Sequence, residues 1–223
     1  MTYQRIENDT LKGITEGILV QHGVHHNYNE RSGGGTTRVM EWTLQDERFK
    51  TLFKGDICYP TVTIINSNNK ETALRLKVGV FRLICSNGLT IGDEWLSHKI
   101  VHRTGKTVEQ KLDWFMEDLN DLIEYLSKGD YMDELAQEVT TPLWEVDRMY
   151  QLAGSLRLPN KTKDELFYMI ENPPRERDNI IDLWTFYNNV NEAIDRTVKR
   201  DSPARERYNK ELLEDIIELA KVV

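Results

Sequence analysis

The hydrophobic pattern of this chain changes its period once, close to Thr107, and that change constrains the fold more than any other feature. Residues 57–103 contain β-branched runs separated by polar turns, which is typical of strands. From Thr107 onward, apolar residues recur every three or four positions, as they do on the buried face of a helix. We therefore expect an α+β fold, with an antiparallel sheet and hairpins in a β-rich N-terminal half and helices in the C-terminal half. Residues 1–106 and 107–223 are expected to pack as one composite domain.

Turn chemistry and capping signals place the main elements. Asn87-Gly88 is the strongest hairpin signal, because a type I′ turn needs positive φ at both central residues. Thr107 and Gln110 form a capping box that predicts the start of a long helix ending at Lys128-Gly129. The other expected elements are strands at 38–44, 59–66, 72–85, 89–91 and 98–103, a helical turn at 46–54, and helices at 142–153, 162–171, 178–199 and from 203 onward. The short, mixed stretch at 10–20 predicts no element.

The net charge of −8 is unevenly distributed along the chain. Residues 56–106 contain seven Lys and Arg against four Asp and Glu, a net charge of +3. Residues 107–147 contain two Lys and Arg against twelve Asp and Glu, a net charge of −10. The overall acidity argues against a protein coated in positive charge for duplex DNA. The basic stretch still allows one face suited to a single strand.

Targeting signals and cysteine usage indicate the compartment. No apolar run approaches the roughly 20 residues that a membrane span needs, and residues 1–10 lack the layout of a secretory signal. The two cysteines, Cys58 and Cys85, are too few for a disulfide framework. We therefore expect a cytoplasmic protein, in the host cell if a phage encodes it, with no membrane partner.

Basic residues gather on the predicted strands. Arg75 and Lys77 share one face of the strand at 72–85, opposite to its apolar side chains. Arg82 joins that face only if Gly79 marks a bulge. The residues predicted to bind single-stranded nucleic acid are Arg75, Lys77, Arg82, Lys99, Arg103 and Lys106 at the phosphates, with Phe81 and Trp95 stacking on bases. The same pattern also fits cations that cover a solvated sheet face or pair with the acidic helix that follows.

Acidic residues line the outward face of the helix predicted to begin at Thr107. Asp113, Glu117 and Asp121 are spaced four residues apart, so they share one face of the helix. Helices present such solvated faces routinely. The alternative function is that these carboxylates bind and inhibit a host protein, such as a defence nuclease.

Candidate metal ligands and nucleophiles are few. His22, His25 and His26 form an H-x-x-H-H motif, but no C-x-x-C pair accompanies them, so we expect locally packed or solvated histidines and no metal. Cys85-Ser86 and His102 have no nucleophile elbow, P-loop or dinucleotide-binding motif beside them. We expect no cofactor and favour a non-catalytic protein, with an enzyme that uses these residues left open.

Two segments carry a family resemblance. The run YPTVTIINSNNKETALRLKVGVFRLICSNGLTIG at 59–92, followed by HKIVHRTG at 98–105, resembles a phage/plasmid-like protein family of unknown function, number nine-three-two. The later segment WTFYNNVNEAIDR at 184–196 is similar to a second motif of that family, with Asn189 in place of its alanine. The resemblance covers about residues 59–200, and nothing before Tyr59 is carried over from it.

The resemblance implies an origin on a phage, prophage or plasmid and implies no chemistry. Combined with the basic strands, it leads to the hypothesis of a non-catalytic protein that binds single-stranded nucleic acid in DNA recombination or annealing. The oligomeric state stays open, a homo-oligomer included, since no heptad repeat declares a coiled-coil interface.

Overall fold

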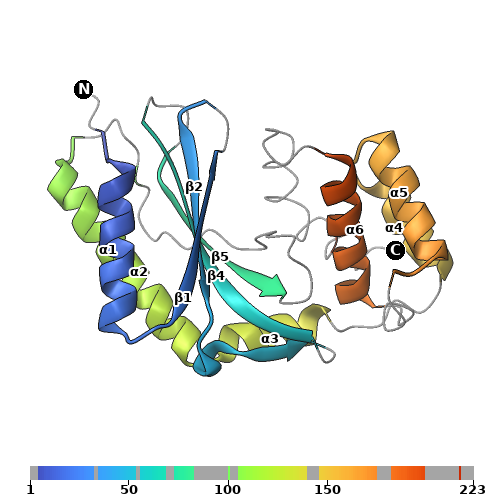
Figure 1. The fold of residues 1–223 in the computed structure, drawn as a ribbon, viewed down its shortest axis with the longest axis horizontal. Helices are drawn as coiled ribbons and strands as arrows, with labels where there is room; N and C mark the ends of the chain where they lie inside the picture. The colour runs from blue at the N-terminus through green and yellow to red at the C-terminus, as the bar shows by residue number, and fades with distance from the viewer. Residues whose placement is uncertain are drawn as a thin grey trace.

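The computed structural model describes residues 5–32, 35–53, 56–68, 73–82, 100, 105–139, 146–174, 182–198 and 216. The strands are β1 (His26–Ser32), β2 (Thr37–Leu44), β3 (Thr51–Phe53), β4 (Asp56–Ser67) and β5 (Arg75–Arg82). The helices are α1 (Asn8–Gln21), α2 (Val108–Ser127), α3 (Asp130–Val139), α4 (Val146–Ser155), α5 (Asn160–Glu171) and α6 (Leu183–Thr197), with a short 3₁₀ helix η1 (Glu47–Phe49). The expected α+β fold, with a β-rich N-terminal half and a helical C-terminal half, is confirmed (Figure 1). Figure 1 shows α1 and α2 on one side of the sheet and α4, α5 and α6 on the other.

β4 is the central strand of an antiparallel sheet. β2 pairs with residues 61–67 along one edge of β4, and β5 pairs with residues 58–65 along the other. β1 pairs with the outer edge of β2. β3 pairs with residues 56–58 on the same edge of β4 as β2. Pro60 lies between the segments that pair with β3 and β2, where its missing N–H costs no ladder bond on that edge.

One face of the sheet is apolar and carries the first core. Trp42, Val62 and Val78 lie next to one another in register on β2, β4 and β5, and all three are buried. α1 and α2 cover this face, with Leu19 and Phe115 among the buried side chains they contribute. Burying a side chain of this kind stabilises the fold by roughly 1.5–3 kcal/mol relative to leaving it exposed.

The C-terminal helices build a second core. Leu166 of α5 and Phe186 and Val190 of α6 are buried in one cluster. Cys58 of β4 and Val80 of β5 belong to the same cluster. This cluster therefore links the C-terminal helices to one end of the sheet.

The capping box at the start of α2 is confirmed. The Gln110 backbone N–H donates to Thr107 Oγ1 at 3.3 Å, and the Thr107 N–H donates to Gln110 Oε1 at 3.1 Å. α2 ends before Lys128, and Gly129 has a φ of 81°. A residue with that left-handed φ is most easily a glycine, so this end of the helix matches the sequence signal.

α1, like α3, is a helix that the sequence pattern did not predict. Its buried face is a single narrow stripe that includes Leu11, Thr15, Ile18 and Leu19. Thr15 is tolerated there because its hydroxyl donates to the Leu11 carbonyl oxygen at 2.8 Å. With so few apolar residues, packing against the sheet and α2 stabilises this helix more than its own periodicity does.

Other boundaries differ in ways that have local causes. The turn expected at 46–54 is helical only at η1 and then continues into β3. α6 begins at Leu183 because the Asp182 carboxylate accepts a hydrogen bond from the Thr185 N–H at 2.6 Å and caps the helix. The hairpin at Asn87-Gly88, the strand at 89–91 and most of the strand at 98–103 lie outside the described residues. None of the helices in the described ranges is both long and apolar enough to cross a membrane.

Candidate nucleic-acid interface

The side of the sheet opposite to α1 and α2 is lined mainly by polar residues. Successive residues along a strand point to opposite faces, so every second residue of each strand lies on this side. The observed register aligns these residues across neighbouring strands. We call this side the polar face; it is formed by Asn27, Asn29, Arg31, Val39, Glu41, Thr43, Thr61, Thr63, Ile65, Arg75, Lys77 and Gly79.

A row of polar side chains crosses four strands of the polar face. Asn29, Glu41, Thr63 and Lys77 occupy successive register positions on β1, β2, β4 and β5. The Glu41 carboxylate accepts from Asn29 Nδ2 at 3.3 Å and lies 3.5 Å from the guanidinium of Arg31. A buried carboxylate needs such partners, because losing its hydration is costly. β1 therefore orients the carboxylate at the middle of the face.

Two hydroxyl groups beside this carboxylate have no visible partner. Thr61 is 5% exposed and Thr63 is 2% exposed. Neither Oγ1 atom has a hydrogen-bond partner in the structure as described. A threonine hydroxyl can both donate and accept, but these two oxygen atoms are buried and offer almost no surface to a ligand.

The structure brings two predicted phosphate contacts together. Arg75 and Lys77 stand two residues apart on the polar face of β5, as the alternation indicated. Arg75 is half-buried, whereas Lys77 is only 8% exposed. Lys77 therefore offers little surface to a phosphate, and Arg75 is the more accessible of the two cations.

Arg82 would share a face with Arg75 and Lys77 only if β5 had a bulge at Gly79, and it has none. The ladder between β4 and β5 runs without interruption from the pair Ile65–Arg75 to the pair Cys58–Arg82, so Gly79 marks no bulge. Phe81 pairs with Tyr59 in the same ladder.

Lys106 is separated from these cations in the sequence and lies next to α2. It is exposed and places its Nζ 5.4 Å from the centre of the Trp114 ring. The other predicted contact residues, Lys99, Arg103 and Trp95, lie outside the described residues, as do Cys85, Ser86 and His102.

The acidic residues of α2 form a separate surface. Asp113, Glu117 and Asp121 are all exposed, one helical turn apart. Within α2 the only basic residue is Lys111, which is fully buried and has its pKa lowered by that burial. Like charges four residues apart on a helix destabilise it by roughly 0.2–0.5 kcal/mol per pair. This uncompensated row is the arrangement expected of the alternative, protein-binding function.

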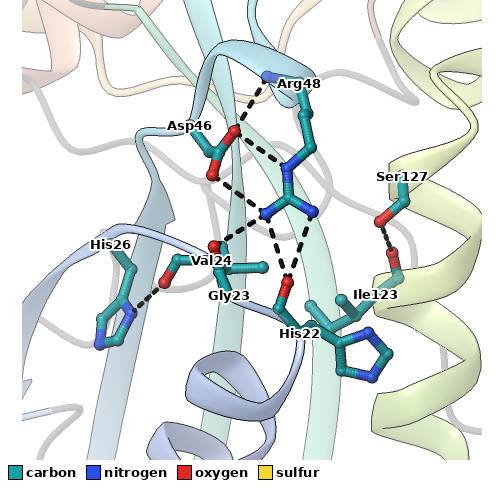
Figure 2. Close-up of polar contacts among 8 residues, drawn as sticks. All are labelled: His22, Gly23, Val24, His26, Asp46, Arg48, Ile123 and Ser127. Carbon is teal, nitrogen blue, oxygen red and sulfur yellow. Dashed lines mark hydrogen bonds and ion pairs between the residues drawn. The ribbon is translucent and has the colours of Figure 1, made fainter.

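The histidine motif does not converge on one point. Figure 2 shows the Nδ1 atom of His26 turned to the Val24 carbonyl oxygen, 3.2 Å away. The Nε2 atom of His22 lies 3.0 Å from Asn120 Oδ1 of α2. Among the described residues, no three His, Cys, Asp or Glu side chains come close enough to hold a metal ion. The motif instead belongs to the connection between α1, β1 and α2.

An arginine that the sequence did not single out organises that connection (Figure 2). The Arg48 guanidinium donates to both carboxylate oxygens of Asp46 at 3.0 Å. It also donates to the carbonyl oxygens of Gly23, at 2.9 Å, and His22, at 3.3 Å. The hydrogen bonds that the Asp46 carboxylate accepts from the side chain and the backbone N–H of Arg48 lower its pKa to about 2. The available sequence signal was Asp46 two residues before Arg48, but the carbonyl partners 25 residues away are a product of the fold.

These observations define an α+β protein with a polar sheet face and an acidic helix, in which the described residues form no cluster of three potential metal ligands. The chain belongs to the family described as Domain of unknown function (DUF932), whose model matches residues 1–216. The family therefore reaches well before Tyr59, and the N-terminal helix and hairpin belong to it.

Two curated relatives come from Escherichia coli (strain K12). The UPF0380 proteins YafZ and YfjQ are each 26% identical to this chain over 135 residues. That match covers 60% of this chain and 48% of each relative, so the chain spans about half the length of the curated relatives it matches. No solved structure matches the chain.

Proposed function

We propose that this chain binds single-stranded nucleic acid on the polar face of its sheet, as a non-catalytic phage- or plasmid-encoded protein acting in DNA recombination or annealing. The observation that carries the proposal is the presence of two partly exposed cations, Arg31 and Arg75, on one face of the sheet that also carries the exposed amides of Asn27 and Asn29. Cations that track phosphates, combined with groups that accept and donate hydrogen bonds, suit a flexible polyanion. The mobile-element origin that the family resemblance implies is consistent with such a role.

The distribution of charge supports a single strand over a duplex. The acidic row on α2 points away from the sheet, and α2 packs on the apolar side, so the acidic row and the polar face lie on opposite sides of the sheet. The sheet therefore separates the polar face from the negative charge of the acidic row. A face with two accessible cations, Arg31 and Arg75, is too small a positive surface to wrap a duplex, whose affinity depends on many phosphate contacts.

The test measures how affinity for a labelled oligonucleotide depends on salt. Fluorescence anisotropy of the wild-type chain should show binding that weakens as salt rises. For Arg75→Gln, the slope of log affinity against log salt should become shallower by about 0.7, the value expected for one lost phosphate contact on a single strand. Lys161→Gln is the matched control, because Lys161 is an exposed cation on α5, away from the sheet.

Two results would contradict the proposal. One is wild-type affinity weaker than about 10⁻⁴ M at physiological salt, the weak end of non-specific binding. The other is an equal loss of slope in Arg75→Gln and Lys161→Gln, which would mean that the polar face is not the binding surface.

The acidic row of α2 supports a second candidate function, binding of a basic surface on a host protein. The observation that supports this second function is the exposure of Asp113, Glu117 and Asp121 on α2, a capped helix that has no exposed basic residue. Reversing these three charges to lysine should abolish capture of the partner from host lysate. The control reverses three other exposed carboxylates, Asp133, Glu134 and Asp164. Equal capture by the triple variant and the wild type counts against this function.

A further inference from the structure

β1 is an outermost strand of the sheet; its Asn27 and Asn29 side is open, whereas Tyr28 on the other side packs against the first core, with its ring centre 4.0 Å from Lys12 Nζ of α1. Among the described strands it pairs with β2 alone, through a continuous ladder of seven residue pairs. Asn27 and Asn29 on the polar face are exposed, and so is Glu30 on the other face. Because no other described strand occupies the outer edge of β1 and its Asn27 and Asn29 side is exposed, a further strand has access to that edge.

This edge lacks most of the features that prevent strand pairing. Natural edge strands are protected by proline, by charged side chains and above all lysine, by a bulge, by a covering helix or loop, or by being very short. β1 is seven residues long, its sequence HNYNERS has no proline or lysine, and its ladder with β2 is regular. Its single Glu and single Arg give the strand no net charge. It is therefore a suitable template for pairing with another strand.

We propose that two copies of this chain pair through β1, antiparallel and about a two-fold axis, so that the two sheets become one. The axis passes between the two Asn29 residues, which allows all seven residues of each strand to overlap. In that register Asn27 lies opposite Arg31 of the second copy, and Tyr28 lies opposite Glu30 of the second copy. No like charges face each other.

Charge selects this register over those centred on Glu30 and Arg31, and the longer overlap selects it over one centred on Tyr28. An axis through Glu30 would place the two Glu30 carboxylates directly opposite each other, and an axis through Arg31 would oppose two guanidinium groups. Like charges directly opposite across an antiparallel pair are destabilising. The Asn29-centred register avoids both arrangements and also buries the longest stretch of edge, which is why a second copy fits this edge.

The pairing has a consequence for the polar face. A two-fold axis perpendicular to a sheet keeps corresponding faces on the same side, so the polar faces of the two copies join. The combined order of strands is β5-β4-β2-β1 followed by β1-β2-β4-β5. At a strand spacing of about 4.8 Å, eight strands span about 34 Å. The pairing itself does not depend on the proposed nucleic-acid function.

Opposite charges placed at one position test the pairing. Asn27→Asp would face Arg31 of the second copy twice per dimer, and Asn27→Lys would place a like charge there twice. Sedimentation velocity should show that the wild-type chain dimerises, that Asn27→Asp tightens the dimer by about twofold to thirtyfold, and that Asn27→Lys weakens it by a similar factor. Both variants remove the Asn27 amide that donates to Gln45 Oε1, so the loss of that amide is common to the two proteins.

Asn160→Asp and Asn160→Lys, at an exposed asparagine on α5, control for the effect of net charge on association. They should leave the dimer dissociation constant unchanged. A wild-type chain that stays monomeric at the highest attainable concentration overturns the proposal. So does a dimer whose dissociation constant moves in the same direction for Asn27→Asp and Asn27→Lys, or moves equally for the Asn160 pair.

Discussion

Replacing Arg48 by glutamine removes the group that ties η1 to the end of α1. The guanidinium is held by Asp46 and donates to the carbonyl oxygens of His22 and Gly23, so the substitution breaks an ion pair and a tertiary cap together. We expect Arg48→Gln to lower the free energy of unfolding by about 1–2 kcal/mol.

The expected loss in the free energy of unfolding is worked out mainly from the pKa of the Asp46 carboxyl group. Hydrogen bonds from Arg48 are the largest cause of the fall in the pKa of Asp46, from 3.8 to about 2. Taken at face value, that shift is worth about 2.4 kcal/mol of native-state stability. Solvent screening reduces it to about 1 kcal/mol, because the Arg48 side chain is 48% exposed. The lost hydrogen bonds to two carbonyl oxygens at the C-terminus of a helix add up to about 1 kcal/mol.

The sign of the pH dependence follows from the direction of the pKa shift. A carboxylate with a depressed native-state pKa contributes its full stability above the unfolded-state pKa, 3.8, and loses it as the pH falls through about 2. The wild-type chain should therefore lose about 1 kcal/mol more than Arg48→Gln between pH 4 and pH 2. Other carboxylates titrate in the same window in both proteins, so the difference between the two curves isolates Asp46.

Urea denaturation followed by circular dichroism at pH 6, 4, 3 and 2 measures both effects. Arg5→Gln is the matched control, because Arg5 pairs with Glu7 at 2.8 Å but both side chains are about half exposed. Its cost should stay below about 0.5 kcal/mol, as is usual for a surface pair. Parallel stability curves for the wild type and Arg48→Gln between pH 4 and pH 2 would refute the reasoning.

Two further substitutions probe the ends of helices. Gly129→Ala should cost about 1 kcal/mol in urea denaturation, because φ is 81° at that residue and an added Cβ is strained there although it meets no neighbour within 4 Å; an unchanged midpoint would contradict this. Asp182→Ala should cost about 2 kcal/mol and Asp182→Asn distinctly less, since asparagine also caps a helix by accepting from the Thr185 N–H; equal losses in thermal or urea unfolding would show that the cap is not the cause.

Local sequence signals succeeded where the interactions involved are local. The capping box of Thr107 and Gln110 joins residues three positions apart, so a pattern of residue types was enough to predict it. The shared face of Arg75 and Lys77 follows from strand alternation alone and is confirmed by the register of β5.

Signals failed where the deciding partner is distant in the sequence. α1 was missed because its narrow apolar stripe is stabilised by side chains contributed from the sheet and from α2. Arg48 was missed because its carbonyl partners lie at the end of another element. The sequence pattern also did not predict that Lys77 is buried. Strand alternation indicates which face a side chain occupies, but it does not indicate what covers that face.

The order of strand-forming and helix-forming segments, the uneven charge and the family signature were determined by the sequence alone, because each depends on residue types close together in the chain. The tertiary structure decided which strand lies at the edge of the sheet, which cations remain accessible and where the acidic row points relative to the polar face. These properties depend on pairing and packing between segments tens of residues apart. Such contacts are selected by the burial of the whole apolar surface, and no local pattern specifies them.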